Sequence, residues 1–204
     1  MNTKNRIDTT HVTDRGIRSP QVVGGVVSAV IAAWVVLVVV GGLESVGRHF
    51  LILGVLRLAL FAALAALALT IAAPRSRLGY LGLGAAAVGA AANLAGGVGS
   101  VVTDGWTYDP FGAGAADLAP PWYAYVIGLS AFIFAVGSVL TGIAARSAGW
   151  LAVAAVLGGV LYPMAFVMQG LYGHDPGDLL GHLIWIAPWF VLSVGLSRSA
   201  RAQS

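Results

Sequence analysis

Apolar residues form long runs along this chain, and short polar segments separate them. Four of these runs contain no Asp, Glu, Lys or Arg and cover residues 21–43, 78–102, 118–145 and 147–173. Each run is at least as long as the roughly 20 residues that a helix needs to cross the hydrocarbon core of a bilayer. The pattern therefore predicts membrane-spanning helices.

The polar breaks between the runs divide the chain into six predicted transmembrane helices, arranged as three hairpins. We expect these helices at about 21–43, 50–73, 78–102, 121–145, 148–172 and 179–197. Residues 1–19 are expected to form a polar cytoplasmic tail, 20–198 the transmembrane domain and 199–204 a second cytoplasmic tail. A long outer loop is expected at 103–120. The predicted fold class is an all-α integral membrane protein.

Basic residues gather at one set of helix ends. Of the eleven Lys and Arg residues, nine lie in the segments before the first helix, after the second, after the fourth and after the sixth. Only Arg48 lies at the opposite ends, and Arg57 lies within the second helix. Because cytoplasmic loops carry an excess of Lys and Arg, we expect both termini in the cytoplasm.

Composition supports a membrane protein over a soluble one. Apolar residues make up 58% of the chain and charged residues only 9%, against about 25% charged in an ordinary soluble domain. The net charge of +3 reflects this topology, so we expect no nucleic-acid partner. The expected surroundings are a lipid bilayer, the cytoplasmic membrane of a prokaryote, with a second copy or another membrane subunit as a protein partner.

The chain contains no cysteine, which excludes iron–sulfur clusters and covalent c-type haem. It also contains no P-loop, GxSxG or HExxH motif. We therefore assign no catalytic residue.

Arg57 lies eight residues into the predicted second helix, about 12 Å below its outer end. A charge at such depth costs ~2.5 kcal/mol or more on insertion scales and usually faces a partner or a water-filled cavity. One interpretation makes Arg57 a binding residue for an anionic group. The other has it snorkelling outward, or pairing with Glu44, Asp104 or Asp178 to fix helix packing.

Asn93 lies at a comparable depth in the predicted third helix, so a hydrogen bond between it and Arg57 is geometrically possible. The alternative is that Asn93 only forms a hydrogen bond between helices. Small residues flank it at a spacing of four, which predicts one close-packing face formed by Ala85, Gly89, Asn93 and Gly97.

The segment at 173–182 contains the most suggestive polar spacing. Asp178 and His182 are four residues apart and share a helix face, and with His174 they offer ligands for zinc or another divalent cation. The alternative is that Asp178 caps the helix start without any ligand.

Polar residues within the predicted helices gather in the outer half, which favours a pocket open to the outside. Our leading hypothesis is the binding of a small polar or anionic ligand, or an ion, for sensing or transport. One alternative is a metal-dependent hydrolase acting on lipid, and another is an accessory subunit without chemistry. The predicted ligand-binding residues are Arg57, Asn93, Gln169, Asp178 and His182.

Overall fold

The computed structural model describes residues 10–40, 46–71, 76–104, 122–172 and 175–199. Within these ranges it does not describe the side chains of residues 10–19, 46–49, 70–71, 104, 163–172, 175–180, 182 and 199. The described residues form six α-helices and contain no strand. The helices are α1 (Thr10–Val39), α2 (Val46–Ala66), α3 (Arg77–Asp104), α4 (Trp122–Ala144), α5 (Trp150–Tyr172) and α6 (Asp175–Ser199).

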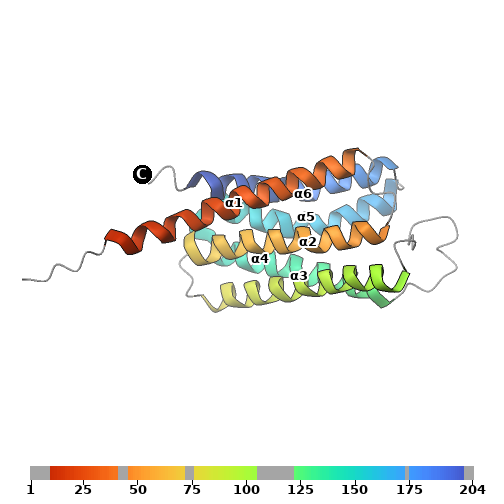
Figure 1. Cartoon of the computed structure of the whole chain (residues 1–204), viewed down its shortest axis with the longest axis horizontal. Helices are drawn as coiled ribbons and strands as arrows, with labels where there is room; N and C mark the ends of the chain where they lie inside the picture. The colour runs from red at the N-terminus through yellow and green to blue at the C-terminus, as the bar shows by residue number, and fades with distance from the viewer. Residues whose placement is uncertain (1–9, 41–45, 72–75, 105–121, 173–174, 200–204) are drawn as a thin grey trace, which may run out of the picture.

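The six helices run along one common axis and form a closed ring (Figure 1). Each helix packs against the next one in the chain, and α1 closes the ring against α6. The start of α1 and the end of α6 lie at the same end of the bundle. A π-helical turn, η1 (Leu67–Ile71), extends α2, and a short 3-10 turn, η3 (Arg146–Ala148), joins α4 to α5.

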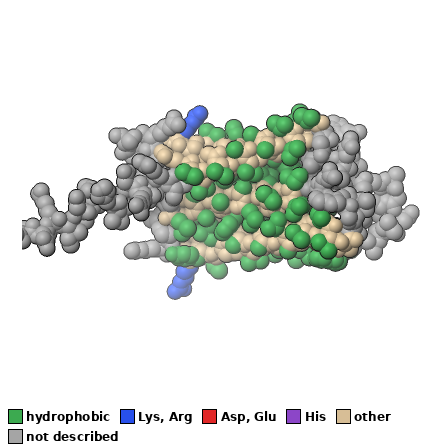
Figure 2. All heavy atoms as spheres, viewed as in Figure 1, with side chains coloured by type: hydrophobic (Ala, Val, Ile, Leu, Met, Phe, Trp, Pro, Cys, Tyr) green, Lys and Arg blue, Asp and Glu red, His purple; other side chains and the backbone are tan. Residues whose placement is uncertain are grey.

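Within the described ranges, four helices are long and apolar enough to cross a membrane. The apolar stretches cover Pro20–Val39, Phe50–Leu69, Arg77–Thr103 and Trp122–Ala144. Apolar side chains cover the middle of the outer surface, as on the face shown in Figure 2. Helix length and composition therefore indicate an integral membrane protein.

Leucines fill the interior of the ring along α2. Leu56, Leu60 and Leu64 follow one another at intervals of four residues and are almost completely buried. They belong to the same core cluster as Leu192 and Leu196 of α6. The cluster extends along α2 on both sides of Arg57, because it also includes Leu53, which precedes Arg57 in the helix.

Glycines allow α3 and α4 to approach each other closely. A Cβ atom added at Gly89 would lie 2.5 Å from the backbone nitrogen of Phe134, and one at Gly82 would lie 2.6 Å from that of Thr141. Real Cβ atoms do not approach other atoms so closely, so larger residues at these positions would push the helices apart. We call this interface the α3–α4 seam.

The seam differs from the predicted packing face at a strict spacing of four. Gly89 faces α4, whereas an added Cβ at Gly97 would meet Phe50 and Leu51 of α2. The prediction of one shared face is therefore wrong. With 3.6 residues per turn, each step of four turns the side chain by about 40°, so the row winds from one neighbouring helix to the other.

Three helices begin earlier than the sequence predicts. Helix α1 starts at Thr10, within the expected tail, and α2 starts at Val46. Helix α6 starts at Asp175, so Asp178 lies within the first helical turn and does not precede the helix as a cap. A carboxylate in the first turn still interacts favourably with the helix dipole.

Candidate functional site

Arg57 lies near the middle of the bundle. It is 11 residues after the start of α2, which places it about 16 Å along the helix. That is deeper than predicted, because the helix begins before residue 50. Its side chain is only 1% exposed, which contradicts the interpretation that it snorkels outward.

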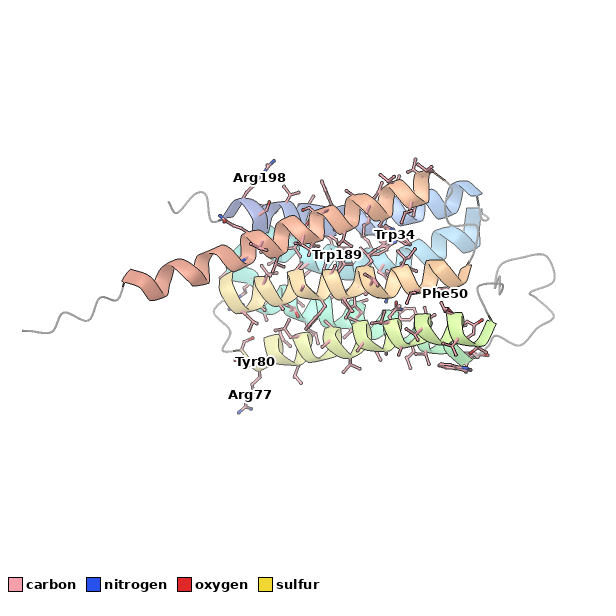
Figure 3. All side chains as sticks on the ribbon, in the orientation of Figure 1. Trp34, Phe50, Arg77, Tyr80, Trp189 and Arg198 are labelled. Atoms are coloured by element: carbon pink, nitrogen blue, oxygen red, sulfur yellow. The ribbon has the colours of Figure 1, made fainter. Side chains whose placement is uncertain are left out.

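Aromatic rings from two other helices surround the guanidinium. Arg57 Cζ lies 4.4 Å from the ring centroid of Tyr162 in α5 and 5.9 Å from that of Phe134 in α4. Two tryptophans of α6 support these rings. The Phe134 and Trp189 centroids are 5.6 Å apart, and Tyr162 meets Trp185 edge to face at 5.4 Å. Figure 3 shows Trp189 within the bundle, well away from both of its ends.

No acceptor among the described residues meets hydrogen-bond geometry with the guanidinium, although the Tyr162 hydroxyl lies near enough to interact with its charge. Its Nε, Nη1 and Nη2 atoms are all buried and unpartnered. Stacking on an aromatic ring contributes about 0.5–2 kcal/mol, whereas removing an ion from water costs several kcal/mol. The aromatic contacts therefore do not offset the burial of this charge. Arg57 needs an acceptor that the described residues do not supply.

Asn93 is fully buried on the α3–α4 seam. Its Nδ2 donates to Ser130 Oγ at 3.2 Å and, more weakly, to the carbonyl oxygen of Ile127 at 3.4 Å. Because a carbonyl only accepts, the contact with Ile127 fixes which end of the amide faces α4. Asn93 Oδ1 is left buried without a donor among the described residues.

The predicted hydrogen bond between Arg57 and Asn93 is not formed, since Asn93 Oδ1 and the three Arg57 nitrogens all lack partners. The two residues nevertheless lie at the same level. Asn93 is 11 residues from the C-terminal end of α3, and α2 meets α3 there, because a Cβ at Gly54 would lie 2.7 Å from Leu94 Cα. The Asn93 amide instead donates its hydrogen bonds to α4.

Serine hydroxyl groups elsewhere among the described residues, whether buried or half-buried, behave differently, because they donate hydrogen bonds. Ser138 Oγ donates to the carbonyl oxygen of Ala155 at 2.6 Å, which links α4 to α5. Ser28 Oγ donates to Ser193 Oγ at 2.9 Å, which links α1 to α6. These groups hold helices together, whereas Arg57 and Asn93 retain unused hydrogen-bonding capacity.

The sequence predicted Arg57 and Asn93 as site residues but missed Phe134 and Tyr162. The signal for the first two was polarity within an apolar run. The aromatic residues carried no such signal, since Phe and Tyr are common throughout apolar helices.

The remaining predicted residues fall outside the described side chains. Gln169 is a position of α5, and Asp178 and His182 are positions of α6. His174 and Glu44 lie outside the described residues. Positions 178 and 182 precede Trp185 and Trp189 by seven residues each, which returns to the same helix face. Among the described residues, no three His, Asp or Glu side chains form a group that could hold a metal ion.

Comparisons of the chain with models of known protein families, with curated proteins and with solved structures found no match.

Proposed function

We propose that this chain is a six-span membrane protein that binds a small anionic ligand at Arg57 from the outer side of the membrane. The observation that carries the proposal is the buried guanidinium without an acceptor. An anion would supply the missing acceptor and balance the charge at the same time, as carboxylates and phosphates do for other arginines.

Helix length supports six membrane spans, and the positions of the exposed arginines support cytoplasmic termini. Helices α5 and α6 have 23 and 25 residues, which corresponds to about 35 Å or more each. Arg77, Arg146 and Arg198 are all exposed, and they lie at the ends of helices that point the same way as the chain termini. Figure 2 shows the first and last of these side chains as blue groups at one end of the bundle.

The apolar filling of the inner half supports binding over passage through the membrane. Leu60, Leu64 and Leu67 follow Arg57 toward the basic end, and each is fully buried. Leu192 and Leu196 add to the same cluster. A hydrated anion would have to lose its water to pass this layer, so the arrangement favours binding or sensing over transport. The hydrolase and accessory-subunit hypotheses stay predictions, and no contact among the described residues favours either.

The proposal is tested by ligand-induced stabilisation of the purified protein in a neutral detergent. Sodium salts of halides, carboxylates, nitrate, sulfate and phosphate are compared at equal ionic strength. A ligand at 100 times its Kd stabilises the folded state by ~2.7 kcal/mol, which a thermal-unfolding assay resolves easily.

The matched variants are Arg57→Met and Arg77→Met. Both remove one positive charge, but Arg77 is exposed at the start of α3. We expect at least one anion to raise Tm in the parent protein and in Arg77→Met but not in Arg57→Met. An equal rise in all three proteins, or no rise with any anion, would contradict the proposal.

A further inference from the structure

Arg57 contributes the one buried charge among the side chains that the structure describes. Among the described side chains, the other arginines, Arg77, Arg146 and Arg198, are exposed. The other buried polar residues are an amide, Asn93, and four serines and one threonine, none of which carries a charge. The described interior therefore presents a charge of +1 to a bound ligand.

From this balance we propose that the Arg57 site takes a small monovalent anion, such as chloride, bromide, nitrate or formate, in preference to sulfate or phosphate. The inference rests on the proposed function and names the ligand class of the same site.

The first reason is the cost of uncompensated charge. A monovalent anion beside Arg57 gives a neutral pair, whereas a divalent anion leaves one net negative charge in an apolar interior. The penalty for burying an ion rises steeply with its charge, and the rings of Phe134 and Tyr162 beside Arg57 carry no net charge that would reduce it.

The second reason is the number of donors. Phosphate and sulfate sites combine several backbone N–H groups, usually at a helix start, with one or more basic side chains. At the level of Arg57 the backbone N–H groups of α2 are used within the helix, and the start of α2 is about 16 Å away. One guanidinium serves one or two acceptor atoms well, which suits a halide or a formate.

Asn93 is consistent with this assignment. Both of its contacts with α4 are made by Nδ2, so the group it leaves free is an acceptor, Oδ1. An acceptor does not bind an anion directly. Its free oxygen fits a water molecule, which can donate one hydrogen to Oδ1 and the other to the anion.

The test measures anion affinity by isothermal titration of the full chain in neutral detergent, with sodium chloride, nitrate, formate, sulfate and phosphate as titrants. We expect Kd values for the monovalent anions at least tenfold lower than those for sulfate and phosphate. Arg77→Met should match the parent protein, Arg57→Lys should keep the monovalent preference because it keeps one charge, and Arg57→Met should lose binding.

The outcomes separate this inference from the proposed function. Sulfate or phosphate binding more tightly than the monovalent anions, still through Arg57, would overturn the inference and leave the proposed function standing. Absence of any Arg57-dependent binding would overturn both.

Crystals grown with bromide provide a measurement that needs no Arg57→Met protein. An anomalous peak within hydrogen-bonding distance of the Arg57 guanidinium is expected. A carboxylate of the chain itself in that place would overturn the inference, because the positive charge would already be balanced.

Discussion

The described contacts of the Arg57 guanidinium are aromatic rings, which carry no net charge and therefore do not neutralise it. In water the same group would be fully hydrated. Without a bound acceptor, the folded protein therefore carries a buried charge that opposes folding. When the Arg57 charge is removed by substitution, the free energy of unfolding should therefore rise if no acceptor is bound and fall if an acceptor is present.

Replacing Arg57 by Met should stabilise the protein in the absence of small anions. Met fills a similar volume with a flexible apolar chain and carries no charge, so we expect a gain of roughly 1–4 kcal/mol in the free energy of unfolding. The measurement is unfolding in mixed detergent micelles, in a buffer free of halide and carboxylate.

Arg77→Met controls for the loss of one arginine and should change stability by no more than about 0.5 kcal/mol, because this side chain is exposed. A loss of about 3–5 kcal/mol in Arg57→Met would contradict the prediction, since that is the effect of removing one partner from a buried ion pair.

The ring of Tyr162 should stabilise the guanidinium through its π face. In a double-mutant cycle of Arg57→Met with Tyr162→Leu, we expect a coupling free energy of about 0.5–2 kcal/mol. Tyr162→Phe keeps the ring and should retain most of that coupling. Equal coupling energies for the Leu and Phe replacements would show that the ring face is not what holds Arg57.

The sequence identifies a buried charge more readily than its surroundings. Arg57 stands out because every neighbour within a helical turn is apolar. Which residues meet it depends on how four other helices rotate about their axes, and the pattern of one helix does not contain that information. The failed pairing of Arg57 with Asn93 has the same origin, because Asn93 is bound by α4 instead.

The close approach of two helices depends on glycines that lie against the backbone of the neighbouring helix. Gly89 and Gly84 both lie in α3, five residues apart. A Cβ at Gly89 would meet the backbone of α4, whereas a Cβ at Gly84 would meet nothing within 4 Å. The two positions therefore provide a matched pair for testing the α3–α4 seam.

Gly89→Ala should destabilise the protein by about 1–3 kcal/mol, because α3 and α4 must separate to admit the methyl group. Gly84→Ala should instead stabilise it by up to about 1 kcal/mol, since alanine has the higher helix propensity. Unfolding in SDS-containing micelles measures both variants. Similar effects of the two substitutions would show that the seam does not limit helix approach.

Helix positions were predictable because an apolar run of about 20 residues has few alternatives to a helix. All six expected helices overlap those observed, and the ends of α3 and α4 agree within two residues. Helix starts were less predictable where polar residues continue a helix beyond the apolar run, as at Thr10 and Asp175. The spacing-of-four face failed for a geometric reason, since it ignored the 3.6-residue turn.

At the scale of the whole molecule, the distribution of arginine predicts orientation. A phosphatase reporter fused after Ser204, active only when exported, should remain inactive, and a reporter active only in the cytoplasm should function at the same position. The reverse result would invert the topology and would place the Arg57 site on the cytoplasmic side of the leucine layer.

The leucine layer also predicts how the protein behaves between two aqueous compartments. Leu60, Leu64 and Leu67 are fully buried in the half of the bundle that follows Arg57, together with Leu192 and Leu196. An anion held at Arg57 would have to cross this layer without water, which costs the free energy of its hydration. Nearby hydroxyl groups do not lower this cost, because they already donate to backbone carbonyls.

We therefore expect binding without passage. Proteoliposomes loaded with chloride and supplied with valinomycin to balance charge should release chloride no faster than protein-free liposomes, although the same preparation binds anions. Leu60→Ser weakens the barrier to chloride, because a hydroxyl in the layer admits water more readily than a leucine. Any chloride release is therefore easiest to detect in this variant. Rapid chloride release from the parent protein that disappears in Arg57→Met would show that the layer opens and that Arg57 belongs to a transport path.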